Sequence, residues 1–503
     1  MRYRNLANRG FVLPTRLQGS ASSSYEAGSA TGSRSRSWMP SASGPNTAAT
    51  RNLGLIRRRA RDAVANDPWA KTSVARWVSN VVGTGIQPYP KHPDPKVRCR
   101  LKAAWADWVG ESDADERLDF YGQQALAARA MFVDGETLAI LRPRLPSDGL
   151  TVPLQIQQLE GDHLPVDMSY SLANGHEIVN GVEFDRLNRR AAYHLYTQHP
   201  GEYGRVIQGG WETKRFDARR VVHAYQVLRP GQVRGVSDLA TILLRLKTLD
   251  NFDDAVAFRQ EVSNLFAGFI KKAPGDGGVD PVHTAGEYYD RDGSEILTLE
   301  PGSLQELGEG EEVQFSAPPG APDNYMEFMR QQLMAAFASV GLPYEIASGD
   351  LRGISDRTLR VVVNEFHRLV QQYQWSTFIH QWCRPIWRSW IEAQVLAGTI
   401  SAQDFQSAKR DWMRVLWVPE GWAYFNPVQD VKAKTDEIRA GLISRSAVIL
   451  AQGEDPETVL DEIAADNKAA DEAGLTLDSD SRHGKRGATT PQIDADPADT
   501  TQQ

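Results

Sequence analysis

The sequence predicts an α+β fold drawn out along long helices, and three observations lead to this expectation. Apolar residues recur at helical spacing over two unusually long stretches, 237–270 and 358–396. Between residues 137 and 225 apolar residues alternate with polar ones instead, which is typical of strands. Of the 503 residues 41% are hydrophobic, with 13 Trp, 15 Tyr and 16 Phe, which excludes a mainly disordered chain.

Charge is distributed unevenly along the chain. Residues 1–61 contain eleven Arg and one acid, Glu26, whereas the remainder carries 45 basic and 63 acidic residues. The net charge of −8 therefore divides into a basic arm of +10 and an acidic body of −18. Such an arm indicates contact with nucleic acid or with an acidic protein surface, and a solubilising disordered tail is the alternative.

The amino-terminal third predicts a flexible arm followed by helices. Ten serines fall between Ser20 and Ser43, so residues 1–50 are expected to be flexible, with order beginning near Leu53. Helical spacing continues to about Ala106, is broken at Asp67-Pro68, and gives way to a turn over residues 82–88. A second helical stretch over 122–133 completes this part.

Strands follow up to residue 225. The predicted strands are 137–141, 154–159, 178–184, 191–196 and 220–225, with a hairpin turn at 185–188. His194 and His223 lie in strand patterns and are expected to be hydrogen-bonded structural residues rather than metal ligands.

The middle of the chain predicts two helices around a small β excursion. Ser237 is a good N-cap for a first helix that runs to about residue 270, a rod of roughly 45–50 Å. Short strands are expected at 295–299 and 312–316, and a second helix begins at Asp323 and stops at Gly341.

The carboxy-terminal part is predicted to be helical after a loop. Residues 342–357 contain two glycines and form the loop, and the helix over 358–396 should kink at Pro385. Asp455-Pro456 starts another helix, while Gly441 and Gly474 occupy C-cap positions. From Asp478 on the chain is polar and expected to be disordered.

No catalytic constellation, metal site or cofactor motif is found in the sequence. Cys99 and Cys383 are isolated and support neither a disulfide framework nor zinc, and no stretch is long and apolar enough for a membrane span. Two acid clusters are interpreted as solvated surface: Asp113, Asp115 and Glu116 in one, Asp253 and Asp254 in the other. Four tryptophans at helical spacing favour a core or subunit contact over a stacking platform for single-stranded nucleic acid: Trp375, Trp382, Trp387 and Trp390.

Several local strings, in their order along residues 53–475, give the chain a family resemblance. The most specific are Arg229-Pro-Gly-Gln-Val-Arg-Gly235 and Gly341-Leu-Pro-Tyr-Glu345. Weaker strings are Arg58–Asp62, Asn66–Ala70, Asn80–Ile86, Asp134–Glu136, Gln158–Glu160, Gly181–Asp185 and Ala440–Arg445. With these strings the chain resembles the lambda-like family of bacteriophage portal proteins, the rings at one capsid vertex through which DNA is packaged and ejected.

The resemblance implies a portal fold: an α/β wing, a long-helix stem, a small β-containing clip and a helical crown, assembled as a ring oligomer. Its regions would be a flexible basic arm 1–52, wing 53–236, stem helix 237–270, clip 271–322, second stem helix 323–341, tunnel loop 342–357, long kinked helix and wing 358–430, crown 431–475 and a disordered tail 476–503.

The resemblance also implies site residues. The tunnel loop would present Glu345, Ser348, Asp350 and Arg352 to the DNA channel, and the clip would offer Glu295, Glu300, Glu309 and Glu311 to the terminase motor. A loop of balanced charge and an acidic body suit the passage of DNA better than its retention, because a wall that neutralised many phosphates would hold the duplex.

The implied partners are a ring of twelve copies, double-stranded DNA, the terminase large subunit, capsid and scaffold proteins, and head-completion or connector proteins, with no catalysis, cofactor or membrane. The location would be the capsid vertex of the virion, after assembly in the host cytoplasm. A nuclease with a helical accessory domain and another structural virion protein are the alternatives. Neither needs two long helices around a small β insert.

Overall fold

The computed structural model describes residues 37, 40–202, 212–265, 324–422, 426–477, 480 and 482, and four short strands at 269–272, 288–289, 295–296 and 311–314. It is a mixed helix and sheet structure, as predicted. Most of the predicted arm and tail lies outside the described residues.

Four helices of the amino-terminal region surround the core. They are α1 (Pro45–Asn66), α2 (Pro68–Val81), α3 (Pro95–Val109) and α4 (Phe120–Asp134). The break at Asp67-Pro68 is confirmed, because the Asp67 carboxylate accepts hydrogen bonds from the amides of Trp69 (2.7 Å) and Ala70 (3.0 Å) and so caps α2.

The boundary of the basic arm was placed too late in the sequence. Helix α1 begins at Pro45 rather than near Leu53, and Pro at the first helical position favours that start. The Asn46 side chain donates to the carbonyl of Gly231 (3.0 Å) and accepts from the amide of Val233 (2.9 Å), so distant residues hold this first turn in place.

The central sheet has three antiparallel strands in the order β3-β2-β9, with bounds Leu154–Leu159 for β3, Glu136–Pro143 for β2 and Val221–Tyr225 for β9. Helix α4 enters β2 through Gly135, whose φ of 87° is left-handed and therefore favours glycine. A Cβ on Gly135 would come within 2.2 Å of the Val236 backbone carbon, so the chain also needs glycine there for space.

A second antiparallel sheet follows the order β4-β5-β6-β7-β8. Its strands are Tyr170–Ser171, Glu177–Val179, Val182–Phe184, Arg190–Tyr196 and Thr213–Asp217. The single strand predicted over 178–184 is wrong, because the chain reverses at Asn180 (φ 51°) and Gly181 (φ 83°). An Asn-Gly pair at two left-handed positions is a strong hairpin signal.

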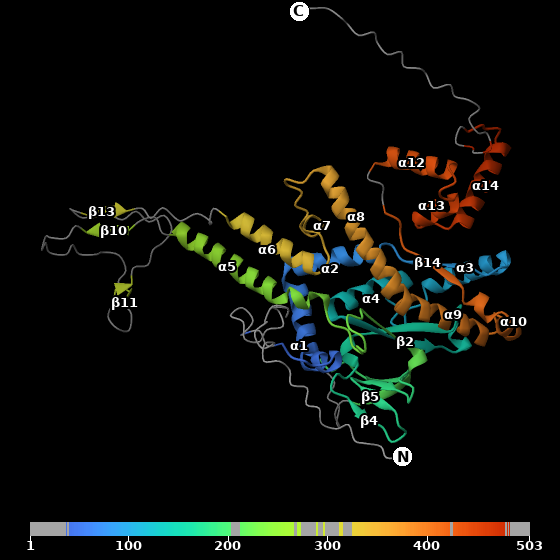
Figure 1. Cartoon of the computed structure of the whole chain (residues 1–503), viewed down its shortest axis with the longest axis horizontal. Helices are drawn as coiled ribbons and strands as arrows, with labels where there is room; N and C mark the ends of the chain where they lie inside the picture. The colour runs from blue at the N-terminus through green and yellow to red at the C-terminus, as the bar shows by residue number, and fades with distance from the viewer. Residues whose placement is uncertain are drawn as a thin grey trace, which may run out of the picture.

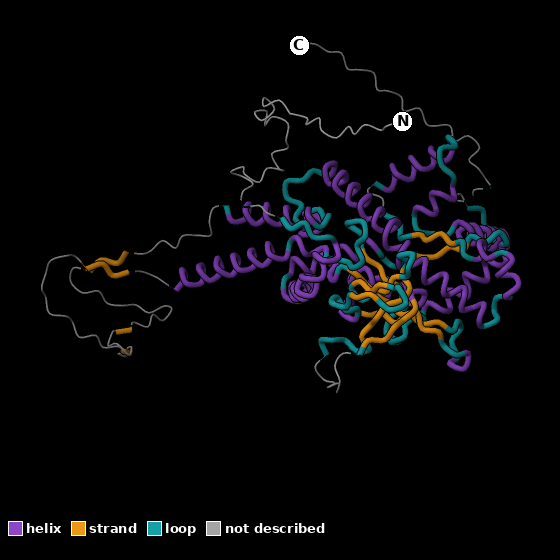
Figure 2. The backbone as a smooth tube through the Cα atoms, turned by 60° about the horizontal axis from the view of Figure 1, so that its bottom comes forward, coloured by secondary structure: helices purple, strands orange, loops and turns teal. Residues whose placement is uncertain are grey.

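The helices α5 (Leu243–Leu265) and α6 (Tyr325–Ser339), in the region expected to form the stem, leave the body side by side (Figures 1 and 2). The rod predicted over 237–270 is shorter than expected: residues 238–241 form a 3-10 turn capped by Ser237, α5 has 23 residues, and Phe269–Lys272 form strand β10. Beyond the stem, β10 pairs with β13 (Glu311–Gln314) and β11 (Tyr288–Tyr289) with β12 (Glu295–Ile296).

The loop predicted over 342–357 contains a short helix, α7 (Tyr344–Ser348), and its last two residues belong to α8 (Asp356–Tyr373). Helix α8 continues through a π-helical segment, Gln374–Cys383, into α9 (Arg384–Leu396). Pro385 therefore follows a π-helix at the start of α9 rather than interrupting one long α-helix.

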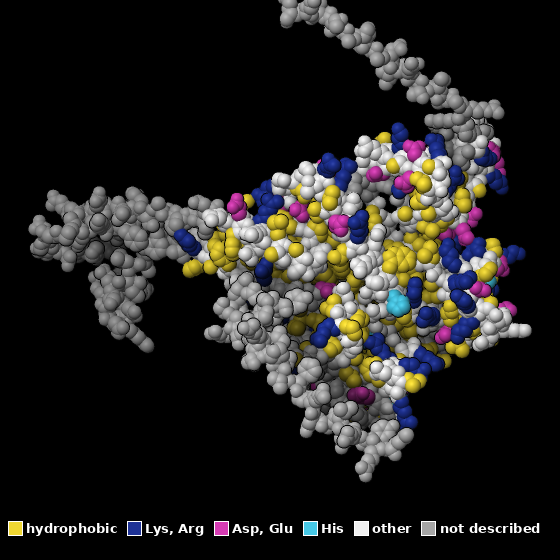
Figure 3. All heavy atoms as spheres, in the orientation of Figure 1, with side chains coloured by type: hydrophobic (Ala, Val, Ile, Leu, Met, Phe, Trp, Pro, Cys, Tyr) yellow, Lys and Arg dark blue, Asp and Glu magenta, His cyan; other side chains and the backbone are white. Residues whose placement is uncertain are grey.

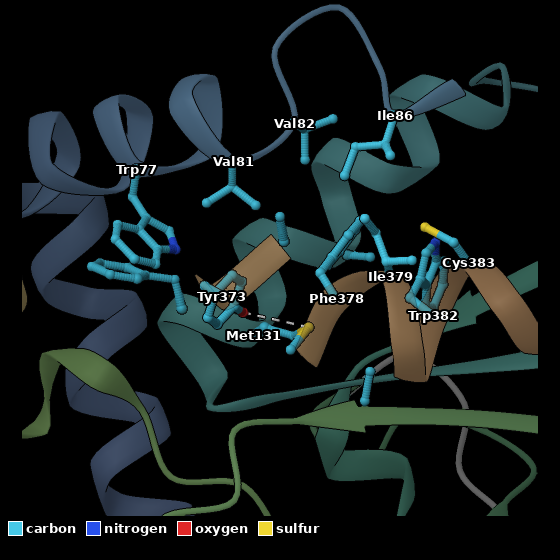
Figure 4. Close-up of a cluster of buried hydrophobic side chains, with 14 of the residues drawn as sticks. Trp77, Val81, Val82, Ile86, Met131, Tyr373, Phe378, Ile379, Trp382 and Cys383 are labelled. Atoms are coloured by element: carbon cyan, nitrogen blue, oxygen red, sulfur yellow. Dashed lines mark hydrogen bonds between the residues drawn. The ribbon is translucent and has the colours of Figure 1, made fainter. Parts of the chain in front are cut away.

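The main core forms where α2, α4 and the π-helical segment meet, and Figure 4 shows Trp77 and Val81 of α2 above Tyr373 and Phe378. The Tyr373 hydroxyl donates to the sulfur of Met131 (3.6 Å). Three of the four tryptophans expected in a core are buried, Trp382, Trp387 and Trp390, whereas Trp375 is 45% exposed.

Strand β14 (Val415–Val418), after α10 (Ala402–Ser407) and α11 (Lys409–Trp412), pairs with β1 (Gln87–Pro90). Three helices cover the region expected to form the crown: α12 (Pro427–Arg439), α13 (Arg445–Ala451) and α14 (Pro456–Glu472). Gly441 (φ 73°) and Gly474 (φ 66°) follow α12 and α14, as predicted for C-caps. None of the helices that the structure describes is both long and apolar enough to cross a membrane.

Candidate functional site

Helices α5 and α6 are joined by aromatic contacts on one face. The rings of Phe252 and Tyr325 stack with centroids 6.1 Å apart, and Phe328 lies 5.3 Å from Phe252. The Tyr325 hydroxyl donates to Asp253, so this carboxylate is not simply solvated as the sequence interpretation held.

The same helices also expose large apolar side chains. They are Leu244 and Phe258 on α5, and Met326, Phe328 and Met334 on α6. Exposed apolar groups clustered on a projecting element are characteristic of an interface with another protein surface.

The segment after α6 is held by its own side chains. Pro343 precedes α7, and Gly349 ends it with a left-handed φ of 72°. The side chains of Tyr344 and Ala347 in this helix are buried. The Ser348 hydroxyl donates to the carbonyl of Tyr344 (2.6 Å) and accepts from the amide of Asp350 (3.1 Å). Ser348 therefore shapes the segment, whereas it was expected to face the channel.

Asp350 and Arg352 form a bidentate ion pair. Arg352 donates from Nε to Oδ1 (2.7 Å) and from Nη2 to Oδ2 (2.9 Å) of Asp350. The hydrogen bond from Arg352 holds the pKa of Asp350 well below its usual range. The Arg352 side chain is 68% exposed and that of Asp350 only 12%, so the guanidinium is the group the segment presents outward.

A cation on α6 braces the same segment. Arg330 donates from Nη2 to the carbonyl of Arg352 (3.0 Å), and its guanidinium lies 5.5 Å from the ring centroid of Tyr344. Glu345 is half-buried in α7. Of the four residues expected in the tunnel loop, Ser348, Asp350 and Arg352 are thus linked by hydrogen bonds, and the charges of Asp350 and Arg352 compensate each other.

Two of the four residues expected at the clip lie in described strands. Glu295 lies in β12 opposite Tyr289, and Glu311 lies in β13 opposite Lys272. Glu300 and Glu309 lie outside the described residues.

A buried ion cluster, not foreseen in the sequence, joins several of the strings that carried the family resemblance. Glu136 of the central sheet accepts from Arg57 Nη2 (2.6 Å) and Arg234 Nη2 (2.5 Å), and all three side chains are fully buried. Burial alone would raise the pKa of Glu136, but Arg234 and Arg57 outweigh it and hold the pKa well below its usual range. The sequence does contain a signal for this cluster, because several arginines fall in residues 57–61 and two acids in residues 134–136.

Arg61 extends this cluster to the surface. It pairs with Asp134 (2.8 Å), Glu160 (3.0 Å) and Asp162 (2.5 Å). Glu160, Asp162 and His199 also bring their ligand atoms close enough to hold a metal ion. The Arg61 guanidinium already compensates both carboxylates, so the residues present fit an ion-pair network.

The histidines of the strands are hydrogen-bonded, as predicted. His223 lies 3.2 Å from Glu136 and is buried, which lowers its pKa to about 4. His194 lies 3.0 Å from the buried Glu183.

The acid cluster at 113–116 is not solvated surface throughout. The buried Asp113 carboxylate accepts from the amides of Asp115, Arg117 and Leu118 and from the side chain of Gln123 (2.9 Å). Burial alone would raise its pKa, and these donors outweigh it to lower the pKa. Asp113 therefore organises the turn before α4.

A cavity of about 540 Å³ with a mainly apolar lining lies where the turn before α5 and the end of α6 meet α8 and the π-helical segment. Asp238 and Tyr373 are the titratable residues that line it. Burial raises the pKa of Asp238 to about 7, so this carboxyl is half-protonated near neutral pH.

Comparisons with known proteins identify relatives. Residues 31–374 match the family model described as "Phage portal protein, lambda family". The "Probable portal protein" of Halomonas phage phiHAP-1 is 24% identical over 442 residues, covering 84% of this chain and 81% of the relative.

Two solved structures are similar in part. A chain in the neck of a native GTA particle, computed with C12 symmetry, is 14% identical with a TM-score of 0.43 over 81% of this chain and 94% of that one. An HK97-family phage portal protein from Corynebacterium diphtheriae is 11% identical with a TM-score of 0.31 over 61% of this chain and 85% of that one.

Proposed function

The chain belongs to the lambda family of phage portal proteins, and from this premise we propose that twelve copies form a ring whose stem helices surround a DNA channel. A portal protein is the capsid component through which double-stranded DNA enters and leaves. The observation that carries the proposal for this chain is the projecting pair α5 and α6, which is held together by Phe252 and Tyr325 and leaves apolar side chains uncovered.

Those uncovered side chains support association through the stem. Leu244 is 71% exposed near the base of α5, and burying a leucine of this kind against a neighbouring subunit contributes about 1.5–3 kcal/mol. Repeated around a ring, such contacts would hold the subunits together with no ligand between them.

Residues 342–355 are proposed as the tunnel loop. The Asp350–Arg352 pair leaves this segment almost neutral, and the guanidinium is the more exposed partner. Duplex DNA would then meet a cation whose charge Asp350 already compensates. Such a contact releases few counterions from the DNA, so it binds the duplex weakly and permits sliding.

Docking of terminase at the clip, contacts of the basic arm with capsid, scaffold or DNA, and assembly in the host cytoplasm are proposed with it. The virion is the place where a portal protein of this family acts. No catalytic role is proposed, since neither a nuclease nor another virion protein accounts as well for the stem.

Ring formation tests the proposal. The purified chain should give rings in negative-stain electron microscopy and a matching mass by light scattering. Leu244→Glu should prevent ring formation while the subunit stays folded, because it places a charge in the stem contact. Leu187→Glu, a change at a leucine that is 72% exposed in a wing hairpin, should not prevent it. A monomer at every concentration and salt would overturn the ring.

The tunnel loop is tested by packaging. Arg352→Ala should alter the length of DNA retained in particles without affecting ring formation. The matched control is Arg189→Ala, which removes an exposed arginine also paired with an aspartate, Asp185, at 2.9 Å. If particles of the two variants retain DNA of equal length, Arg352 does not act on DNA in the channel.

A further inference from the structure

A groove far from the stem gathers cations without lining acids. It has a volume of about 430 Å³ and lies between the first two turns of α9 and the antiparallel strand pair β1–β14. Its lining residues are Lys91, Arg384, Trp387, Arg388, Met413, Arg414, Val415 and Leu416. Four of the eight are cationic and none is acidic.

The fold brings these cations together from three places in the sequence. Arg384 and Arg388 are one helical turn apart on α9, which puts them on the same face. Lys91 follows β1 directly and its amide donates to the carbonyl of Arg414 (3.0 Å), so these two residues lie opposite each other across the strand pair.

Most of this charge is uncompensated. Arg414 pairs with Asp411 at 3.2 Å, and Arg384 approaches only the ring of His380, at 3.5 Å. Among the residues that the structure describes, no carboxylate lies within ion-pair distance of Lys91, Arg384 or Arg388. Like charges that line one groove repel one another, so the arrangement is unfavourable unless an anion binds.

The basic surface continues beyond the groove. The Trp412 ring, next to Met413 in the chain, lies 4.9 Å from the ring of His92 and 5.8 Å from the guanidinium of Arg100 on α3. Figure 3 shows several Lys and Arg side chains at the right-hand end of the molecule, with Asp and Glu side chains between them. The groove together with Arg100 on α3 is called the basic strip.

We propose that this strip binds the phosphate backbone of double-stranded DNA that lies outside the channel. An extended row of cations fits a polyanion of regular charge, and duplex DNA carries one negative charge per about 1.7 Å. The apolar lining offers little to an acidic peptide, since Trp387 is 1% exposed and the others are half-buried. The inference rests on the proposed function, because the portal role is what brings duplex DNA to this chain.

Binding of a duplex to the assembled full-length chain tests the proposal. The variant R384A/R388A removes two exposed arginines from the groove. The matched control R219A/R220A removes two exposed arginines that follow β8 in the wing. Fluorescence anisotropy of a labelled duplex of random sequence is measured from 50 to 200 mM salt, and ring formation of each protein is checked by electron microscopy.

The expected result is a weaker dependence of the duplex-binding constant on salt in the groove variant alone. Each phosphate contact contributes about 0.9 to the slope of log K against log salt, so the slope should fall by about 1.8 for each occupied groove. The parent should then lose about tenfold more affinity than R384A/R388A between 50 and 200 mM salt.

Equal slopes for R384A/R388A and R219A/R220A would overturn the proposal. A synthetic peptide of residues 488–503, which contains Asp494, Asp496 and Asp499, is the second arm. Binding of this peptide at the groove with no binding of duplex would assign the groove to an acidic protein segment and would also overturn it. Failure of the parent to form rings, with groove-dependent DNA binding intact, would instead count against the proposed function.

Discussion

Arg234 and Glu136 form an ion pair in which both side chains are fully buried, with Nη2 of the arginine 2.5 Å from Oε1 of the glutamate. Arg234 also donates to the carbonyls of Leu164 (2.9 Å), Gly161 (2.9 Å) and Asn180 (3.1 Å). One side chain thus ties the central sheet to the second sheet.

Removing the cation of this pair should destabilise the subunit strongly. Arg234→Met leaves the Glu136 carboxylate buried with less compensation, and breaking a buried pair in this way costs about 3–5 kcal/mol. Urea denaturation of the unassembled subunit measures it. Arg368→Ala is the control, because its pair with Glu365 is exposed and worth about 0–1 kcal/mol. Similar losses in the two variants would contradict a special role for Arg234.

Two glycines of one string should differ sharply in their tolerance of alanine. A Cβ on Gly235 would lie 2.0 Å from the carbonyl oxygen of Gly135, and backbone cannot move aside cheaply. Gly235→Ala is therefore expected to cost about 3 kcal/mol or more. A Cβ on Gly231 would have no atom within 4 Å. The change Gly231→Ala should therefore lower the free energy of unfolding only by the cost of an alanine at a left-handed φ of 78°, about 1–2 kcal/mol. Thermal unfolding of both variants decides, and equal losses would refute the steric argument.

Stability should depend on pH through Asp238. Because burial raises the pKa of this carboxyl to about 7, the native state binds a proton that the unfolded state releases near pH 4. Stability from this group is full below about pH 4 and is lost as pH rises through about 7, with a slope of at most about 1.4 kcal/mol per pH unit. Asp238→Asn should flatten this part of the pH profile in urea denaturation. An unchanged profile would place the titrating group elsewhere.

Helix α14 should loosen when its contact with α3 is removed. Lys102 bonds Asp455 and lies 3.2 Å from Glu457, while Arg98 pairs with Glu457 at 2.8 Å. Losing a charged hydrogen bond of this kind costs about 1.5–3 kcal/mol, so Lys102→Ala should speed hydrogen exchange in α14 at least about tenfold. Lys468→Ala, whose pair with Glu472 is exposed at 3.9 Å, is the control. If α14 exchanges at the parent rate, other contacts hold the crown.

Much of the secondary structure could be predicted because its signals are local. Asp67-Pro68 separates two helices, and Gly341 ends α6 with a φ of 76°, since a cap or a left-handed glycine acts within one turn of the chain. The Asn180-Gly181 reversal was equally local and could have been predicted. The length of α5 could not, because apolar spacing persists into β10, where strand pairing with β13 replaces the helix.

The sequence by itself determined the family, the order of the elements and the division into a basic arm and an acidic body, because these follow from short strings, periodicity and composition. Only the tertiary structure decided which charges meet. Arg57, Glu136 and Arg234 lie far apart in the chain yet share one buried cluster, while Lys91, Arg388 and Arg414 share a groove with almost no acid. Coulomb energy depends on distance in space and on burial, and neither can be read from separation along the chain.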